Sequence, residues 1–307
     1  MRSMTVTRGG MLTTVQDLGR WGHQHLGIPV AGPMDWYSHR LANRLVGNSE
    51  DAAALEITLV GPELRPSADV ACAIAGASFE VTCDGAPVIV NASFVARRGV
   101  TMKFRSRVRG ARAALAVKGG FSVTPVLGSR ATSLISRMGP FGGRALAAGD
   151  VLAIGSDDGA GSSGGRPLPL PEGGARLRVI PGPHQSRFTE DAVRVLTAAR
   201  FTVTPDSNRM GYRLDGAVFA RTDQVEMLSD ATPIGSIQVP PSGLPILLMA
   251  DRQTTGGYPK IATVITADVP LAGQLAPGDW IEFVPCTRET AIEALRRREA
   301  ALSGVTR

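Results

Sequence analysis

The chain has 307 residues, of which 43% are hydrophobic and 20% charged, and its formal net charge is +6. A chain of this length buries roughly three-quarters of its unfolded surface, so its core needs neither disulfides nor a structural metal. The three cysteines form no CxxC pair and have no histidine at ligand spacing, which excludes the usual zinc patterns and favours a reducing compartment.

No segment predicts secretion or a membrane span. The first residues lack a basic start followed by a long apolar run, so we expect no secretory signal. The apolar stretch at residues 244–250 ends at Asp251, far short of the roughly 18 residues that a membrane span requires. We therefore expect a cytoplasmic protein that does not contact a membrane.

Short strands joined by tight turns are expected to dominate, because the chain has 36 glycines and 21 prolines but only 5% aromatic residues. In chain order, residues 34–46 predict a helix, with Asp35 as its N-cap and Gly47 as its stop. Residues 79–90 predict a hairpin around the turn Asp84-Gly85.

A basic strand is predicted next. Residues 97–112 contain seven basic side chains and no acidic one. Four of them alternate with residues that would form a mostly apolar face: Lys103, Arg105, Arg107 and Arg109 against Met102, Phe104, Ser106 and Val108. We interpret the basic face as solvated or facing a partner. Stacking aromatic residues are not interleaved, so nucleic acid is not an expected partner.

The clearest boundary is the Gly-, Ser- and Pro-rich segment at residues 155–174, which cannot form a core. Residues 161–165 match the G-x-S-x-G pattern of a hydrolase nucleophile, but this match lies inside the low-complexity segment and we assign it no catalytic role. We predict a β-domain at residues 1–155, a linker at 156–175, a second β-domain at 176–286, and a C-terminal helix and tail at 287–307.

The two halves end with a similar phrase. Leu-Ala-Ala-Gly-Asp at residues 146–150 and Leu-Ala-Pro-Gly-Asp at residues 275–279 each precede an apolar run, which suggests two related domains. Helices are expected at residues 188–199, after Thr189, and at residues 290–302, with a Thr290/Glu293 capping box. The predicted fold is mostly β, with two small barrels and a few short helices.

Three turn-rich segments gather charges, amides and glycines: residues 10–35, residues 206–213 with 234–238, and residues 251–260. Loops on a rigid β scaffold often carry binding groups. The sequence has no Walker loop and no GxGxxG after a strand, and its four histidines form no metal pattern such as HExxH. If ATP is used, this chain does not hold it in a recognised phosphate loop, and we expect no metal site.

These segments together resemble the family of the 5-oxoprolinase C subunit, also described as KipA, allophanate hydrolase subunit 2 or biotin-dependent carboxyltransferase-like. The resemblance runs from residue 5 to about residue 285. It is carried by TTVQDLGRWGHQHLGIPVAGPMD at residues 13–35, SNRMGYRLDG at 207–216, GSIQVPPSG at 235–243, LLMADRQTTGGYPKI at 247–261 and LAPGDWIEF at 275–283.

The resemblance implies two cyclophilin-like β-barrels in one component of an ATP-dependent amide or lactam hydrolase that is active only as a complex. A KipI-like partner, the B subunit, would help to activate 5-oxoproline with ATP, and the A subunit would complete its opening to glutamate. One alternative is a carboxyltransferase or allophanate hydrolase-related component of urea degradation. Biotin would then arrive on another chain, because no Met-Lys-Met attachment motif is present here. The other alternative is a KipA-type regulatory partner of a kinase inhibitor.

Amide activation requires cations near phosphoryl and carboxylate groups, donors at the developing oxyanion and a carboxylate that handles a proton. Asp251 is the expected acid/base, with Lys260 as a point charge and Tyr258 as a hydrogen-bonding group. Arg209 and Arg213 are expected to clamp a carboxylate. The remaining expected substrate-binding residues are Gln238, Gln253, Thr254, Gly256, Gly257, Asp17 (the second acid/base candidate), Arg20 and His25.

Overall fold

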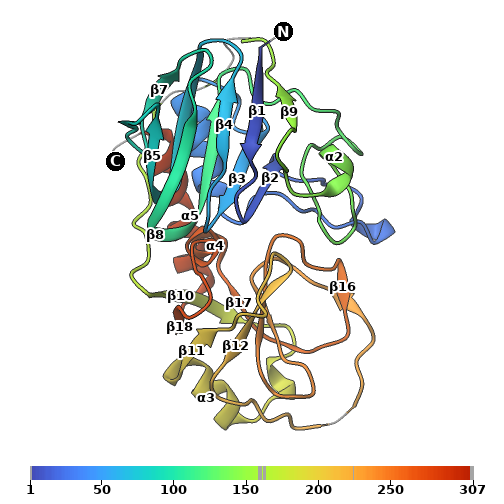
Figure 1. Cartoon of the computed structure of the whole chain (residues 1–307). Helices are drawn as coiled ribbons and strands as arrows, with labels where there is room; N and C mark the ends of the chain where they lie inside the picture. Colours follow the sequence, from blue (N-terminus) through green and yellow to red (C-terminus); the bar gives the residue numbers. More distant parts are fainter. Residues whose placement is uncertain (1, 158–160, 162–163, 224, 305–307) are drawn as a thin grey trace. The chain divides into compact units, whose positions relative to one another are not determined.

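The computed structural model describes residues 2–157, 161, 164–223 and 225–304 (Figure 1). The chain divides into two compact units. Unit 1 comprises Met1–Trp21, Ala31–Leu170 and Glu299–Arg307, and unit 2 comprises Gly22–Val30 and Pro171–Arg298. The expected domain boundaries at residues 155 and 176 remain a prediction. Ser162 and Ser163 of the G-x-S-x-G match lie outside the described residues.

Unit 1 is built on a nine-stranded sheet with the order β2-β3-β8-β4-β1-β9, in which β5 pairs with β6, β7 and β8. All the pairings are antiparallel. The strands are β1 (Ser3–Arg8), β2 (Leu12–Gln16), β3 (Ala54–Thr58), β4 (Glu63–Pro66), β5 (Val70–Cys83), β6 (Ala86–Pro87), β7 (Ser93–Ala96), β8 (Met102–Val117) and β9 (Val151–Ala153).

The predicted hairpin forms at the turn between β5 and β6. Asp84 and Gly85 have φ values of 47° and 88°, so both residues are left-handed, as a two-residue type I′ turn requires. The basic segment lies in the first half of β8, but its predicted apolar face is wrong in part. Val108 is 66% exposed, because three register shifts between β5 and β8 interrupt the regular alternation there.

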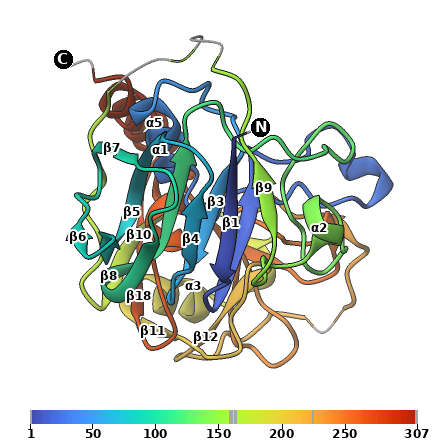
Figure 2. The same ribbon diagram turned by 45° about the horizontal axis from the view of Figure 1, so that its top comes forward.

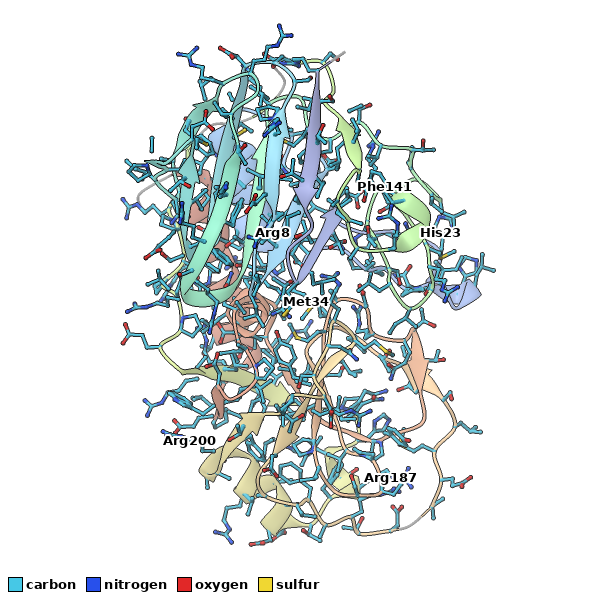
Figure 3. The ribbon with its side chains drawn as sticks, viewed as in Figure 1. Arg8, His23, Met34, Phe141, Arg187 and Arg200 are labelled. Carbon is cyan, nitrogen blue, oxygen red and sulfur yellow. The ribbon has the colours of Figure 1, made fainter. Side chains whose placement is uncertain are left out.

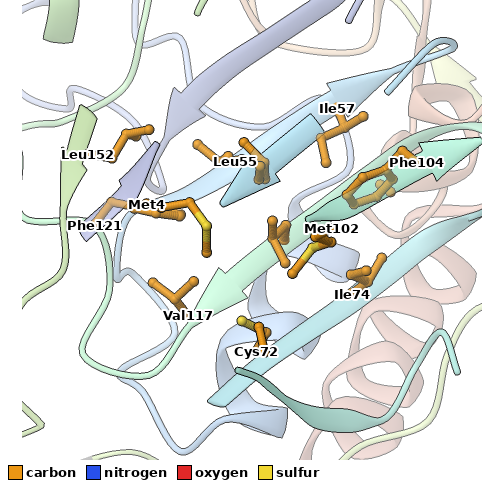
Figure 4. Packing of buried hydrophobic residues seen from close by; sticks show 14 of the residues in the cluster. Met4, Leu55, Ile57, Cys72, Ile74, Met102, Phe104, Val117, Phe121 and Leu152 are labelled. Atoms are coloured by element: carbon orange, nitrogen blue, oxygen red, sulfur yellow. The ribbon is translucent and has the colours of Figure 1, made fainter. Parts of the chain in front are cut away.

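The core of unit 1 lies on one face of this sheet. Leu55, Ile74, Met102 and Phe104 are at most 1% exposed and pack with other apolar side chains from β1, β3, β5, β8 and β9 (Figure 4). Burying each side chain of this size contributes about 1.5–3 kcal/mol, so this cluster is the main source of unit 1's stability.

Helix α1 (Trp36–Leu45) covers the other face of the same sheet (Figure 2). Tyr37 and Leu41 pack on four alanines of β5 and β8, whose small side chains let the helix approach closely: Ala73, Ala75, Ala114 and Ala116. The helix starts as expected, because the Asp35 carboxylate accepts a hydrogen bond from the Ser38 N–H at 2.9 Å.

Unit 2 contains a closed barrel with the strand order β10-β17-β14-β15-β12-β11-β18, closed by the parallel pair β10 and β18. Its strands are β10 (Gly174–Pro181), β11 (Arg200–Val203), β12 (Gly211–Asp215), β14 (Ser236–Gln238), β15 (Ile246–Leu248), β17 (Lys260–Val264) and β18 (Trp280–Pro285). A separate pair joins β13 (Asp230–Ala231) to β16 (Thr255–Gly256). The mostly-β prediction is therefore confirmed, with a closed barrel in unit 2 and an open sheet in unit 1.

The repeated Gly-Asp phrase folds in the same way in both units. The Asp150 carboxylate accepts a hydrogen bond from Ala147 N–H, and the Asp279 carboxylate accepts one from Ala276 N–H, each at 2.8 Å. Each turn then leads into the strand that follows, β9 in unit 1 and β18 in unit 2. The short sequence match thus corresponds to a shared aspartate-capped turn.

The remaining helices are short, apart from α5. They are α2 (Pro140–Gly143), α3 (Glu190–Ala198), α4 (Val269–Gly273) and α5 (Arg288–Ser303), with 3₁₀ turns at Gln24–Leu26, Gln185–Arg187 and Thr266–Asp268. Thr189 caps α3 as predicted, at 3.1 Å from Ala192 N–H. The predicted Thr290/Glu293 capping box is wrong: α5 begins earlier, and Thr287 Oγ1 accepts from Thr290 N–H at 3.2 Å. Among the described helices, none is long and apolar enough to cross a membrane.

Candidate functional site

The loop at residues 251–260 connects β15 to β17 in unit 2 and contains β16 (Figure 1). Thr232 anchors this loop with three of its groups. Its N–H donates to Thr254 O at 3.1 Å, its hydroxyl donates to Gln253 O, and its carbonyl accepts from Arg252 Nε at 2.7 Å. Because Thr232 directly follows β13, the loop is fixed to a paired strand and its side chains are held in place.

Asp251 forms a buried ion pair with Arg209. Asp251 Oδ2 accepts from Arg209 Nε at 3.0 Å and Oδ1 accepts from Nη2 at 3.1 Å. The two side chains are only 1% and 4% exposed. Asp251 N–H also donates to Arg209 O at 2.8 Å, so the loop before β12 and the loop after β15 are joined by backbone and side chain. The structure thus brings these two predicted residues together.

Lys260 forms a second ion pair, in which the lysine is buried and the carboxylate is exposed. Its Nζ donates to Asp230 Oδ2 at 2.9 Å and to Ala231 O at 2.7 Å. The Lys260 side chain is 1% exposed, whereas the Asp230 side chain is 52% exposed. The hydrogen bond from Lys260 is the main reason why the pKa of Asp230 lies below its ordinary value. The ammonium is therefore held in a fixed position, with its counter-ion facing solvent.

His184 lies against this pair. Its Nδ1 accepts a hydrogen bond from Lys260 N–H at 3.2 Å, and its Nε2 lies 3.7 Å from Asp230 Oδ2. Burial, followed by the Lys260 charge, lowers the pKa of His184. The acceptor role of Nδ1 also requires that the proton of the neutral ring sits on Nε2, facing Asp230.

Two side-chain amides form a chain beside the loop. Gln253 Nε2 donates to Gln238 Oε1 at 3.1 Å, and Gln238 Nε2 donates to Tyr258 O at 3.4 Å. Gln238 is 1% exposed, while Tyr258 is 44% exposed and its ring faces solvent. Linked amides of this kind can present both a donor and an acceptor to an amide or ureido group of a ligand.

A side chain at residue 256 would displace the two amides of this chain. A Cβ at residue 256 would lie 2.8 Å from Gln238 Nε2 and 3.0 Å from Gln253 Nε2. A Cβ at Gly257 would meet no atom closer than Met227 O at 3.2 Å. The close approach of backbone and amides is therefore specific to residue 256.

We expect Gly256→Ala to push the two amides apart and to cost about 1 kcal/mol of unfolding free energy, the lower end of the penalty for an overpacked site, because the displaced atoms are the ends of glutamine side chains. Gly257→Ala is the matched control and should cost clearly less. Denaturant unfolding of the two variants measures the difference. Equal costs in the two variants would show that the amide chain does not depend on the glycine.

The other predicted residues are placed differently. Arg213 lies on β12 with an exposed side chain, and no contact among the described residues joins it to Arg209. His25 lies exposed in the Gln24–Leu26 turn of unit 2. The predicted clamp of Arg209 and Arg213 therefore has one buried, paired member and one exposed member.

Asp17 and Arg20 belong to unit 1, where both organise the segment at residues 126–131. Asp17 accepts from Ser129 Oγ at 2.6 Å and from Arg130 N–H. Arg20 donates to Val126 O at 2.8 Å and to Ala131 O at 2.9 Å. Their visible contacts are with the protein itself, and any part that they play toward a substrate stays a prediction.

Sequence reasoning missed Thr232, Asp230, His184 and Arg252. Arg252 lies in the loop at residues 251–260 that the sequence predicted as a site, so it could have been included among the candidate residues. Asp230 could not have been found this way, because it is thirty residues from Lys260 and in no recognisable pattern with it. Pairing of β13 with β16 brings these residues together, and no local feature of the sequence predicts that pairing.

The N-terminus of helix α3 in unit 2 does not favour a phosphate group. Helix α3 begins with the acidic Glu190 and Asp191, which repel phosphate at the helix N-terminus. Lys260 and Arg209 already have carboxylate partners. We therefore place no step of ATP chemistry on this chain alone. Among the described residues, no group of three or more His, Cys, Asp or Glu could hold a metal ion.

Comparison with known proteins gives a consistent result. The family model "Carboxyltransferase domain, subdomain A and B" matches residues 26–285. The chain is 39% identical to the C subunit of 5-oxoprolinase from Escherichia coli, over 95% of this chain and 94% of that protein. It is 37% identical to the C subunit of 5-oxoprolinase from Haemophilus influenzae, over 96% and 94%. The crystal structure of K. lactis urea amidolyase matches 99% of this chain but 20% of that one, with 30% identity and a TM-score of 0.93.

Proposed function

The chain belongs to the family described as carboxyltransferase domain, subdomain A and B. From this premise we propose that the chain is one component of an ATP-dependent lactam hydrolase of the 5-oxoprolinase type. One observation carries the proposal. The match to the 5-oxoprolinase C subunit extends over 94% of that protein, whereas the chain covers 20% of the urea amidolyase chain. The likeness is thus to a whole polypeptide of the first enzyme and to a fraction of the second.

The chemistry explains why ATP is needed. An unstrained amide resists water, whereas phosphorylation of its oxygen lets water add to the carbonyl carbon. The carbon–nitrogen bond then breaks, which gives an acyl phosphate, and a second water displaces phosphate from the acyl carbon to leave the carboxylate. In this proposal the chain binds the lactam, and the B and A subunits supply the rest of the machinery. The linked amides of Gln238 and Gln253 would hold the ring amide. Lys260 gives two of its three N–H donors to Asp230 and Ala231, and the third would donate to the reacting oxygen.

We propose Asp251 as the acid/base. Its carboxylate would exchange a proton with the lactam nitrogen. A carboxylate offers about four lone-pair positions, and the two hydrogen bonds from Arg209 leave others available. The ion pair would then fix the orientation of the carboxylate. The exposed phenol of Tyr258 and the backbone at Gly256 and Gly257 would contact the substrate from the same loop.

The test is reconstitution with homologues of the B and A subunits. We expect the purified chain alone to hydrolyse little or no ATP, because its sequence contains no recognised phosphate loop. The assembled complex should hydrolyse ATP when 5-oxoproline is added and should form glutamate. Strong 5-oxoproline-dependent ATP hydrolysis by the chain alone would contradict the division of labour. A complex that is inactive toward 5-oxoproline would contradict the proposal itself.

A second candidate function is carboxyl transfer between carboxybiotin and urea. The TM-score of 0.93 to K. lactis urea amidolyase over 99% of this chain favours it. The linked amides of Gln238 and Gln253 suit a ureido group equally well. The complex can be offered a carboxylated biotin carrier and urea. Transfer of the carboxyl group to urea, without glutamate formation from 5-oxoproline, would select this function.

A further inference from the structure

Arg252 is a half-buried cation that lacks a carboxylate partner. Its Nε donates to Thr232 O at 2.7 Å, and its Nη1 donates to Met249 O at 3.5 Å. Both acceptors are neutral carbonyl groups. Within the ranges that the structure describes, no Asp or Glu lies at ion-pair distance from Arg252, and no acceptor contacts its Nη2. One amino group of the guanidinium is therefore available to a ligand.

The other half-buried arginines of unit 2 are paired, and the contrast makes Arg252 distinctive. Arg187, labelled in Figure 3, lies 2.6 Å from Asp223, and Arg178 lies 2.6 Å from Asp268. Arg209 has Asp251. Arg252 differs from these three arginines because the acceptors of its side chain are neutral carbonyl groups. Burial alone lowers the pKa of Arg252 to about 10, which leaves the side chain protonated at neutral pH.

The charges around the loop leave a surplus of one positive charge. Arg209 is neutralised by Asp251, and Lys260 is neutralised by Asp230, while His184 is neutral above its lowered pKa. Arg252 is therefore the uncompensated cation of this group. The adjacent residue Gln253 belongs to the amide chain that faces Gly256. Thr232 connects the cation to this site: its carbonyl oxygen accepts from Arg252 Nε at 2.7 Å, and its Cγ2 would lie 3.3 Å from a Cβ at Gly256, the residue that the amides face.

We propose that Arg252 binds the carboxylate of an anionic small-molecule substrate, and that this makes the site selective for a carboxylate-bearing lactam over a neutral amide such as urea. The proposal rests on the lactam hydrolase function given above and names the substrate class for it. A planar guanidinium matches a carboxylate in shape, and its Nη2 donates charge-assisted hydrogen bonds. Arg252 thus takes the role that sequence reasoning gave to Arg209 and Arg213.

The experiment compares 5-oxoproline with 2-pyrrolidone, the same ring without the carboxylate, in the assembled complex. Arg252→Gln should raise the KM for 5-oxoproline by about 10- to 100-fold, the loss expected for a hydrogen bond to a charged group. Arg252→Gln also removes the hydrogen bond from Nε to Thr232 O, so the rate with 2-pyrrolidone reports any loosening of the loop. The loss with 5-oxoproline should exceed the loss with 2-pyrrolidone by about 10-fold or more, and Arg252→Lys should restore part of the affinity. Arg194→Gln, an exposed arginine of helix α3, is the charge-matched control and should behave as the unmodified protein.

A loosened loop would lower the rates with both substrates alike, so a loss confined to 5-oxoproline assigns the effect to the contact with its carboxylate. A KM for 5-oxoproline that Arg252→Gln leaves unchanged would overturn the inference while the lactam hydrolase function stands. If the unmodified complex does not turn over 5-oxoproline, equilibrium titration of the chain separates the two ideas. Binding of 5-oxoproline that depends on Arg252 supports the inference, whereas Arg252-dependent binding of inorganic phosphate alone overturns it.

Discussion

Asp251→Asn is expected to slow turnover of the assembled complex by about 10²–10⁴-fold, the usual contribution of a positioned acid/base. The same change removes the partner of a guanidinium that is only 4% exposed. Breaking a buried pair by removing one charge costs about 3–5 kcal/mol of unfolding free energy. Steady-state rates and denaturant unfolding should therefore both change, and the two effects need to be separated.

A double-mutant cycle with Arg209→Gln separates them. In the doubly substituted protein neither charge remains, so we expect part of the lost stability to return. If Asp251 handles the proton, turnover should stay low even when stability returns. If turnover recovers together with stability, Asp251 serves only to neutralise Arg209. Asp215→Asn, an exposed carboxylate on β12, controls for the loss of one negative charge.

His39 should make unit 1 sensitive to acid. It is 1% exposed on α1, and its Nε2 contacts Asn43 Nδ2 at 3.3 Å. Burial lowers the pKa of His39 from 6.5 to about 4, against the opposing charges of Asp17 and Asp51, while Arg40 lowers it further. The unfolded chain therefore binds this proton more readily than the folded protein. The stabilising effect is fully present above the unfolded pKa of 6.5 and is lost as the pH falls to about 4.

The difference between 6.5 and about 4 corresponds to a loss of about 3 kcal/mol. Urea unfolding of the unmodified chain and of His39→Gln, followed from about pH 7 to about pH 4, measures it. The stability of His39→Gln should fall less steeply by about that amount. His25→Gln is a suitable control, because His25 is exposed. Parallel pH profiles for the unmodified chain and His39→Gln would contradict the assignment.

Local signals in the sequence were sufficient for much of the fold. The Asp35 cap, the Thr189 cap and the Asp84-Gly85 turn each depend on a few neighbouring residues, and all three form as expected. The start of α5 was misplaced, because Thr287 and Thr290 are both good capping residues and only the structure shows which of them is used. The predicted alternation of apolar and basic side chains along β8 is wrong at Val108, because the register shifts there depend on the partner strand β5.

The candidate site was predictable in its loops but not in its pairings. Residues 251–260 were identified from glycines, amides and charges close together in the sequence, and the structure holds them in one anchored loop. The pairing of Lys260 with Asp230 depends on the long-range contact of β13 with β16. Sequence alone also could not separate the neutralised Arg209 from the uncompensated Arg252, because that distinction depends on where each carboxylate lies.

The most direct test of the account follows the ring carbonyl oxygen of 5-oxoproline during turnover by the reconstituted complex. If ATP phosphorylates that oxygen and water then cleaves the acyl phosphate at its carbon–oxygen bond, an isotope label placed on the oxygen should leave in the inorganic phosphate. Mass spectrometry of the phosphate and of the glutamate measures the label. The account predicts labelled phosphate that requires this chain in the complex. Unlabelled phosphate, with the label retained in glutamate, would contradict it.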